Sequence, residues 1–413
     1  MRQIYTGIDI GSDSIKIVVS EFINNKFYIL ASASKKTKGI KKGLIINPQE
    51  LIETLREALS EIEKSIGVKI NEAIITIPSN ERILEIVSSS VVIGEKEVSG
   101  NDIVNVLYKA AIDNKKENYE LVSIMPIVFN IDGNGNYRDP KGQKGKELEA
   151  KAVIASIPSK IVYEFLKVFV ECNVEVSDIV ISGIADYFEL KSDNTKGTLG
   201  AIINVGSETT DISIFNKGIL IKNSIINLGS KNIDKDIAYI YNLELDVSKE
   251  LKEKFAVCSR RYADANDLIE AKSKEKENTT INQYEITEIV ESRVNEILNL
   301  AKKEINDLTK RKLSYIIITG GISDLVGFSY IVENIFGINA STHLNSTIGI
   351  RSNKYSTSMG MIKYFHEKME LRNKKNSLLN EEKINEMMIN KRSIIELSED
   401  TLIGKIFGSF IND

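Results

Sequence analysis

Hydrophobic and polar residues form two similar runs, one at the start of the chain and one near its middle. The first run, residues 4–33, is rich in β-branched residues interrupted by Gly7 and Gly11, and it predicts a β-hairpin. The second run begins at Leu199 and again predicts strand, turn and strand, followed by a helix at about 233–241. Because both hairpin turns are rich in Gly, Ser, Thr and Asp, we interpret the chain as an internally duplicated α/β protein.

The region between the two runs contains a predicted helix and a segment of different composition. Apolar residues recur at helical spacing over 48–67, and residues 73–77 return to strand character. Residues 84–160 combine strand-like stretches, a helix that Ser99 would cap and a turn at 132–135. We interpret residues 84–160 as a compact inserted module.

The last part of the chain divides into a charged segment and an apolar one. Residues 367–400 carry seven Lys or Arg and eight Asp or Glu with few strand formers, which predicts a linker. In residues 401–413 the apolar side chains share one helical face. This pattern favours an amphipathic helix that inserts into a membrane surface without spanning it, and packing on the protein's own core or on a neighbour is the alternative. The predicted membrane-binding residues are Leu402, Ile403, Ile406, Phe407, Phe410 and Ile411.

Charge and composition exclude several other classes of protein. The chain has 413 residues, with 54 Lys and Arg against 58 Asp and Glu, a balance that disfavours nucleic acid as a partner. Its two cysteines and two histidines do not form a disulfide framework or a zinc motif, and we expect a reducing compartment. We expect no signal peptide, because residues 1–7 enter a strand-like pattern without a basic region followed by an apolar one. We expect no transmembrane helix, because no run of about 18 apolar residues occurs.

The first hairpin turn has the residues of a phosphate-binding turn. In residues 7–16, a strand ends at Asp9, and Gly11 and Ser12 allow backbone N–H groups to approach an anion closely. Lys16, on the returning strand, could reach the same anion, and Asp9 could order water around Mg²⁺. A plain hairpin uses the same residue types, so this turn alone leaves both readings open.

Two further stretches have related patterns. Residues 204–211 repeat the turn between two apolar strands, and a pair of facing turns could clamp the phosphates of a nucleotide between two lobes. Residues 316–323 form an apolar run that ends in Gly320 and Gly321, ahead of a predicted helix at 328–336. Bare backbone at such a position could lie against a base or ribose, although a simple strand-to-helix loop explains the glycines as well.

In this order and at these separations, the three stretches resemble the phosphate-1, phosphate-2 and adenosine motifs of the actin, Hsp70 and sugar-kinase superfamily. Residues 126–149 resemble a signature of the bacterial FtsA family of actin-like cell-division proteins, most specifically in the spacing Asp-Pro-x-Gly-x-x-Gly-x-x-Leu-Glu over 139–149. Residues 291–297 and 355–360 also resemble stretches of that family. The resemblance extends from the N-terminus to about Phe365.

The resemblance implies a two-lobed actin-like α/β fold made of duplicated ribonuclease-H-like domains, with an inserted α+β subdomain and a C-terminal amphipathic helix. Its implied parts are residues 1–83, 161–195 and 355–366 for lobe 1, 84–160 for the insertion, 196–230 and 312–354 for lobe 2, 231–311 for the upper subdomain of lobe 2, 367–400 for the linker and 401–413 for the membrane helix.

The resemblance also implies ligands and partners. The expected cofactors are ATP and Mg²⁺, bound between the lobes. The implied ATP-binding residues are Asp9, Gly11, Ser12, Asp13, Ser14, Lys16, Gly206, Ser207, Glu208, Thr209, Thr210, Lys252, Gly320, Gly321 and Ile322, and the metal residues are Asp9 and Asp211. The expected partners are the C-terminal tail of FtsZ, further copies of the chain in a head-to-tail filament and the inner leaflet of the cytoplasmic membrane at the division site.

Some residues depart from the superfamily pattern. Asn204 stands where phosphate-2 usually begins with Asp, and Glu208 lies in a turn that is usually Gly-Gly-Gly-Thr. In the helix that cups the nucleoside, the expected Glu is Lys249, whereas the expected Lys is retained as Lys252. With Asp211 as the remaining carboxylate that could orient water, we expect weak or absent ATPase activity and assign no catalytic residue.

Other members of the superfamily give alternative functions. A pilus-assembly ATP-binding protein has a similar inserted module, but the 139–149 signature and the terminal amphipathic pattern favour division. A small-molecule kinase would need fast phosphoryl transfer, which Asn204 disfavours. A chaperone of the Hsp70 type is least favoured, since no peptide-binding domain follows Glu367.

Overall fold

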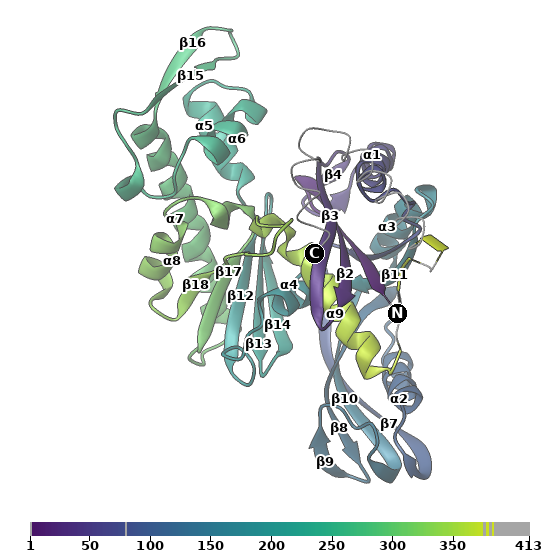
Figure 1. The fold of residues 1–413 in the computed structure, drawn as a ribbon. Coiled ribbons are helices and arrows are strands. Elements are labelled where there is room, and N and C mark those ends of the chain that lie inside the picture. Colours follow the sequence, from purple (N-terminus) through teal and green to yellow (C-terminus); the bar gives the residue numbers. More distant parts are fainter. Residues whose placement is uncertain (1, 79–80, 375–376, 380–381, 384–413) are drawn as a thin grey trace, which may run out of the picture.

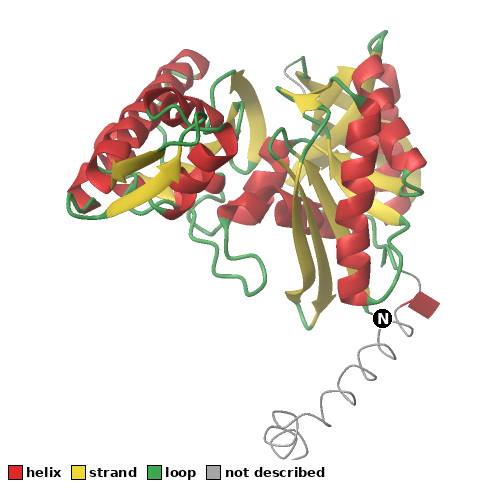
Figure 2. Cartoon of the chain, turned by 90° about the horizontal axis from the view of Figure 1, so that it is seen from above, coloured by secondary structure: helices red, strands yellow, loops and turns green. Residues whose placement is uncertain are grey.

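The computed structural model describes residues 2–78, 81–374, 377–379 and 382–383. In them the chain forms two lobes that lie side by side, each around a mixed β-sheet (Figures 1 and 2). The inserted subdomain projects from lobe 1, and a mainly helical subdomain stands on lobe 2 (Figure 1). The two-lobed α/β organisation predicted from the sequence is therefore confirmed.

The central sheets of the two lobes have the same topology. In lobe 1 the strand order is β11-β6-β1-β2-β3, and in lobe 2 it is β14-β13-β12-β17-β18. Each sheet has three antiparallel strands from one meander, extended on one side by strands that pair in parallel. The strands of lobe 1 are β1 (Gln3–Ile10), β2 (Ser14–Ile23), β3 (Lys26–Lys36), β6 (Glu72–Thr76) and β11 (Glu175–Val180), and those of lobe 2 are β12 (Leu199–Val205), β13 (Thr210–Asn216), β14 (Ile219–Ile226), β17 (Tyr315–Thr319) and β18 (Ala340–Thr342). The shared order confirms the duplication inferred from the two hairpins.

Helices α1 (Pro48–Ile66) and α3 (Ser159–Glu171) cover lobe 1. Helix α1 begins where the Asn47 side chain accepts a hydrogen bond from the backbone of Glu50, and it ends at Gly67 in the left-handed conformation, with φ of 79°. The apolar face of α1 is buried in the core of lobe 1, as its spacing predicts. A short hairpin, β4 (Ile40–Lys41) and β5 (Leu44–Ile45), precedes α1.

Two helices join the lobes at the centre of the molecule. Helix α4 (Ser182–Leu190) packs on the sheet of lobe 2, and α9 (Ser356–Leu371) packs on β1, β2 and β6 of lobe 1. They cross at Gly360, where a Cβ atom would lie 1.9 Å from the carbonyl oxygen of Ala185. The glycine therefore allows the close backbone contact that connects the two halves.

The inserted subdomain has its own sheet, helix and core. Strands β7 (Ile83–Glu97), β8 (Tyr119–Ile131), β9 (Asn134–Tyr137) and β10 (Lys144–Pro158) pair in the order β7-β10-β8-β9. Helix α2 (Gly100–Asp113) packs on this sheet and begins with a capping box between Ser99 and Asp102. Phe129, Leu148 and Ile103 are buried in the core of the subdomain. The predicted inserted module is confirmed as an α+β unit.

The upper subdomain of lobe 2 is mainly helical. It consists of α5 (Lys231–Ile240), α6 (Leu245–Lys254), the short helix η1 (Arg260–Tyr262), β15 (Leu268–Lys272), β16 (Asn278–Asn282) and α7 (Gln283–Leu308). Below it, η2 (Gly321–Asp324), α8 (Phe328–Phe336) and η3 (Asn353–Tyr355) complete lobe 2. No helix in the described ranges is long and apolar enough to cross a membrane.

The charged segment predicted as a linker begins later than expected. Helix α9 continues to Leu371, so a linker beginning at residue 367 is wrong for its first residues. The reason is tertiary: Lys368 pairs with Asp178 on β11 at 2.6 Å, and Met369 is buried against lobe 1. Leu378 and Leu379 are also buried in that core. The predicted membrane helix at 401–413 lies outside the described residues.

Candidate functional site

A cavity of about 560 Å³ opens between the two lobes. The loops at the ends of β1, β12 and β17 form its wall, together with residues from α6 and η3. Fourteen of the fifteen residues predicted to bind ATP line it: Asp9, Gly11, Ser12, Asp13, Ser14, Lys16, Gly206, Ser207, Glu208, Thr209, Lys252, Gly320, Gly321 and Ile322. The structure thus brings three distant sequence stretches to one place.

Thr210 is the predicted ligand that does not line this cavity. It lies on β13, is fully buried, and donates its hydroxyl hydrogen to the carbonyl of Leu228 at 2.8 Å. The hydroxyl therefore supports the packing behind the second turn. Asp211, which follows it, does line the cavity.

The two hairpin turns are equivalent in register. Asp9 pairs with Lys16 across β1 and β2, and Asn204 pairs with Asp211 across β12 and β13. Each turn closes with the same backbone hydrogen bond, from Gly11 to Ser14 at 3.2 Å and from Gly206 to Thr209 at 3.0 Å. The duplication therefore presents two turns of one geometry on either side of the cavity.

The turns can accept an anion. The carbonyl oxygens of Asp13, Gly206 and Ser207 accept hydrogen bonds from backbone N–H groups outside the turns, at 2.8–2.9 Å. Within the described residues no hydrogen bond engages the backbone N–H groups at positions 12, 13, 207 and 208. Successive backbone N–H groups in a turn can form an anion-binding nest, so each turn is a candidate site for a phosphate group.

The third stretch forms an open wall. Gly320 has φ of 104°, which favours glycine, and its backbone lies close to the carbonyl of Val205. A Cβ atom on Gly321 would meet only the Lys354 side chain, at 3.7 Å. There is therefore room beside Gly321 for a flat group in contact with the backbone.

The predicted metal residues have different surroundings. Asp9 accepts hydrogen bonds from Lys16 at 3.1 Å and from the hydroxyl of Thr76 at 2.7 Å. Asp211 forms an ion pair with Arg82, a residue that the sequence analysis did not single out. The side chains of Ser182, Ser213 and Asn223 also donate to Asp211, so that each of its oxygens accepts two bonds. Asp9 is accordingly better placed than Asp211 to face a cation.

A buried carboxylate, Asp186 on α4, lies directly behind the site. It is 1% exposed and accepts hydrogen bonds from Thr357 at 2.6 Å and from the side-chain amide of Asn204 at 2.8 Å. Burial raises the pKa of Asp186 to about 7, with a further contribution from the nearby Asp211 and Asp9 carboxylates. Asn204 thus replaces the aspartate that is usual in this turn, but the carboxylate of Asp186 lies 2.8 Å from the side-chain nitrogen of Asn204.

The lysines of α6 also have carboxylate partners. Lys252 forms an ion pair with Asp234 at 2.6 Å, with both side chains 5% exposed. Lys249 reaches across the cavity to Asp13 in the first turn, at 2.7 and 2.8 Å. Burial opposes the ionisation of Asp13, but the Lys249 ammonium outweighs it and lowers the pKa of Asp13.

Sequence reasoning missed Arg82, Asp186 and Thr357. Arg82 belongs to none of the stretches that the sequence analysis singled out, and Thr357 lies in the stretch 355–360, which indicated the family but gave no role at this site. Tertiary contacts bring both residues to this place. Asp186 did have a local signal, because it is an acidic residue among apolar ones on a short helix. In the described residues, no group of three or more His, Cys, Asp or Glu has the arrangement of a metal centre.

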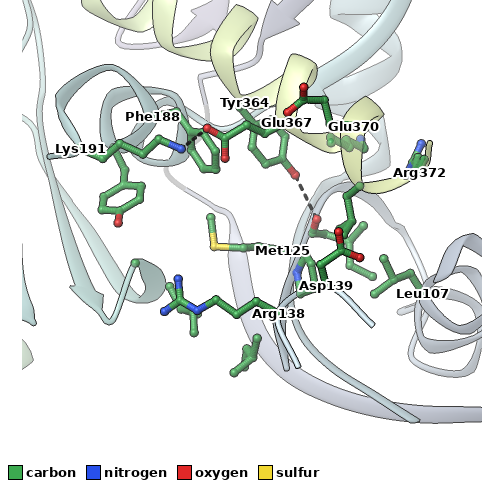
Figure 3. A pocket seen from close by; sticks show the side chains of 18 of the residues that line it. Leu107, Met125, Arg138, Asp139, Phe188, Lys191, Tyr364, Glu367, Glu370 and Arg372 are labelled. Carbon is green, nitrogen blue, oxygen red and sulfur yellow. Dashed lines mark hydrogen bonds and ion pairs between the residues drawn. The ribbon is translucent and has the colours of Figure 1, made fainter. Parts of the chain in front are cut away.

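A second cavity, of about 980 Å³, lies where the inserted subdomain meets α4 and α9 (Figure 3). Its wall mixes apolar and charged side chains, and the charged ones are mainly basic: Arg138, Lys141, Lys191, Lys196, Lys217, Lys368, Arg372 and Lys374 against Asp139, Glu367 and Glu370. Lys191 pairs with Glu367, and the hydroxyl of Tyr364 donates to the carbonyl of Ile124 at 3.0 Å (Figure 3). No predicted ligand-binding residue in the described part of the chain lines this second cavity.

Comparison with known families identifies two matching segments. The sequence profile described as "Cell division protein FtsA" matches residues 201–360, and the profile described as "SHS2 domain inserted in FTSA" matches residues 82–156. The second match coincides with the inserted subdomain, and together the two profiles cover more than half of the chain.

Relatives of this chain include cell division proteins FtsA from several bacteria. The protein from Enterococcus hirae is 24% identical over 87% of this chain and 82% of its own length. The protein from Bacillus subtilis is 24% identical over 88% of this chain and 83% of its own length, and that from Pseudomonas aeruginosa is 24% identical over 87% and 88%.

Solved structures support the fold alone. A chain of the PilM-PilN type IV pilus biogenesis complex has a TM-score of 0.59 with 14% identity, covering 86% of this chain and 97% of that one. MreB5 of Spiroplasma citri bound to ADP has a TM-score of 0.52 with 12% identity, covering 90% and 99%. The actin-like fold predicted from the motifs is confirmed.

Proposed function

Because this chain belongs to the FtsA family of cell division proteins, we propose that it binds ATP between its lobes, polymerises, and attaches FtsZ filaments to the cytoplasmic membrane. The observation that carries the ATP proposal is the convergence of fourteen predicted ligands on one cavity. Two similar turns face this cavity, as a chain of phosphates requires.

The residues present fit an adenine nucleotide. A cavity of about 560 Å³ is within the usual size range of ligand pockets. The turn N–H groups at 12–13 and 207–208 would hold phosphates, Lys16 would balance their charge, and the backbone at Gly320 and Gly321 would lie against the nucleoside. Lys252, which the Asp234 carboxylate holds in place, would lie on the nucleoside side of the cavity.

The site also fits Mg²⁺ that is held mainly by phosphate and water. Mg²⁺ typically needs only one or two protein carboxylates when phosphates are present. Asp9 would provide one, and Asn204 would provide an amide oxygen, because its nitrogen already donates to Asp186 and Thr357. Mg²⁺ would supply charge neutralisation of the phosphates.

Hydrolysis is proposed to be weak or absent. The carboxylate that could orient an attacking water, Asp211, is paired with Arg82 and accepts four hydrogen bonds. Its lone pairs are therefore already in use, and bound ATP would be hydrolysed slowly or not at all.

Family membership also favours division over the alternatives. The pilus-complex neighbour shares the fold at 14% identity, whereas both matching sequence profiles are those of FtsA. The proposed location is the cytoplasmic side of the cell membrane at the division site, reached by the apolar face of residues 401–413 and by contact with the FtsZ C-terminal tail.

A liposome assay tests the membrane and FtsZ parts together. The full chain should sediment with phosphatidylglycerol–phosphatidylethanolamine vesicles and carry FtsZ with it, and FtsZ without its C-terminal tail should stay in the supernatant. Phe407→Glu should reduce sedimentation at least tenfold, because a carboxylate on the apolar face of the predicted helix opposes insertion.

The matched control is Ser409→Glu, which adds the same charge to the opposite face of the predicted helix and should keep most of the sedimentation. If Phe407→Glu sediments as the unsubstituted chain does, residues 401–413 do not anchor the protein. If intact FtsZ also stays in the supernatant, the FtsZ proposal fails.

A further inference from the structure

Besides the contacts of Asp211 and Asn204 described above, three polar contacts join the lobes across the cavity. Asp13 in the first turn pairs with Lys249 on α6, and Lys36 on β3 pairs with Asp246 on α6 at 2.5 Å. The third contact joins the backbone N–H of Lys42, in the β4–β5 turn of lobe 1, to the Glu208 carboxylate at 2.5 Å. Two of these contacts use Lys249 and Glu208, both of which depart from the superfamily pattern.

Glu208 is held from both lobes. One of its oxygens accepts the hydrogen bond from Lys42, and the other accepts one from Lys231 at the start of α5, at 2.8 Å. Its side chain is only 11% exposed. Burial opposes its ionisation, but the bonds from Lys231 and Lys42 outweigh burial and lower the pKa of Glu208. The carboxylate is therefore a fixed negative charge inside the cavity.

The contact to Lys42 links the two phosphate-type turns. The next residue, Gly43, donates its N–H to the hydroxyl of Ser12 in the first turn at 3.2 Å. A chain of contacts thus runs from the first turn, through the β4–β5 turn, to Glu208 in the second turn. An anion between two such turns would make the same connection through backbone N–H groups.

We propose that the Glu208 carboxylate is a built-in anion that holds the two lobes together, as the terminal phosphate of a bound nucleotide would. The cleft is then closed without nucleotide, and the site binds a nucleoside diphosphate more tightly than a nucleoside triphosphate. This inference rests on the nucleotide site proposed above and names its specificity. A third phosphate group would bring further negative charge beside Glu208, and like charges repel each other more strongly in a partly buried site than in water.

Calorimetry with Mg-ADP and a non-hydrolysable Mg-ATP analogue tests the specificity. The unsubstituted full chain should bind ADP at least tenfold more tightly than the ATP analogue. Glu208→Gln removes the charge and keeps an acceptor for the Lys42 N–H. The variant should bind the ATP analogue more tightly, so that the preference for ADP over the analogue falls below about threefold. Glu208→Gly, which restores the residue of the superfamily turn, should do the same.

The matched control is Glu250→Gln, which removes an exposed carboxylate on α6 whose partner is Lys254, outside the cavity wall. This variant should keep the tenfold preference. Equal affinities in the unsubstituted chain, or the same ratio in Glu208→Gln, would overturn the inference while the nucleotide site stands. If neither nucleotide binds, the site proposal and this inference both fail.

Small-angle X-ray scattering gives a readout that does not depend on binding affinity. The radius of gyration of the nucleotide-free chain should not change when Mg-ADP is added, because Glu208 already closes the cleft. Glu208→Gly without nucleotide should have a larger radius, which Mg-ADP reduces. A nucleotide-free unsubstituted chain that contracts on adding Mg-ADP would contradict the built-in anion even if ADP binds well.

Discussion

Gly321→Asp should lower the affinity for ATP at least 100-fold and leave the protein folded. Gly321 lines the cavity, and a Cβ atom at this position would meet only the Lys354 side chain at 3.7 Å. A carboxylate therefore fits sterically, but it occupies the space assigned to the nucleoside and adds negative charge to a site for an anion. Calorimetry measures the affinity, and thermal unfolding reports the fold.

Gly321→Ala is the control for this prediction. Its methyl group has room, so the affinity should change less than about fivefold. Unchanged ATP binding by a folded Gly321→Asp variant would show that the stretch at 320–322 does not contact the nucleotide.

Asn204→Asp should destabilise the protein by about 2–4 kcal/mol, although it restores the residue usual in the superfamily. The side-chain nitrogen of Asn204 donates to Asp186 at 2.8 Å and to Thr357 at 3.2 Å. An aspartate there would place a second carboxylate against the buried Asp186. The free energy of unfolding in urea measures the loss, which should shrink as the pH falls, because a proton shared by the two carboxyl groups removes the like-charge contact.

A second substitution should reverse this loss. In the double variant Asn204→Asp with Asp186→Asn, donor and acceptor exchange places, and stability should return to within about 1 kcal/mol of the original. If the effects of the two substitutions are additive, Asn204 and Asp186 do not act as a pair. Recovery of stability in the double variant would show that Asp186 on α4 provides the carboxylate that the second turn lacks.

Local sequence signals were sufficient to predict most of the framework. The α1 helix follows from apolar spacing together with Asn47 and Gly67 at its ends, and the α2 helix from the capping residue Ser99. The two hairpins follow from β-branched runs broken by glycine-containing turns, and their repetition predicted the duplicated sheet. These features depend on neighbours within a few residues, which a sequence displays directly.

The charge partners at the site could not be predicted in this way. Arg82 meets Asp211, 129 positions away, and Asp13 meets Lys249, 236 positions away. The sequence analysis identified Lys249 and Glu208 only as departures from the superfamily pattern, because their partners across the cleft could not be seen in the sequence. The end of α9 was missed for the same reason, since the charged residue Lys368 pairs with Asp178 in the folded protein.

The central claim is that the two duplicated turns converge on one chain of phosphates. A crystal structure of the full chain with Mg²⁺ and a non-hydrolysable ATP analogue tests it most directly. The phosphates should lie between residues 11–14 and 206–209, with the adenosine against residues 320–322. A nucleotide found instead in the basic cavity beside α9 and the inserted subdomain, with the cavity between the lobes left empty, would contradict the account.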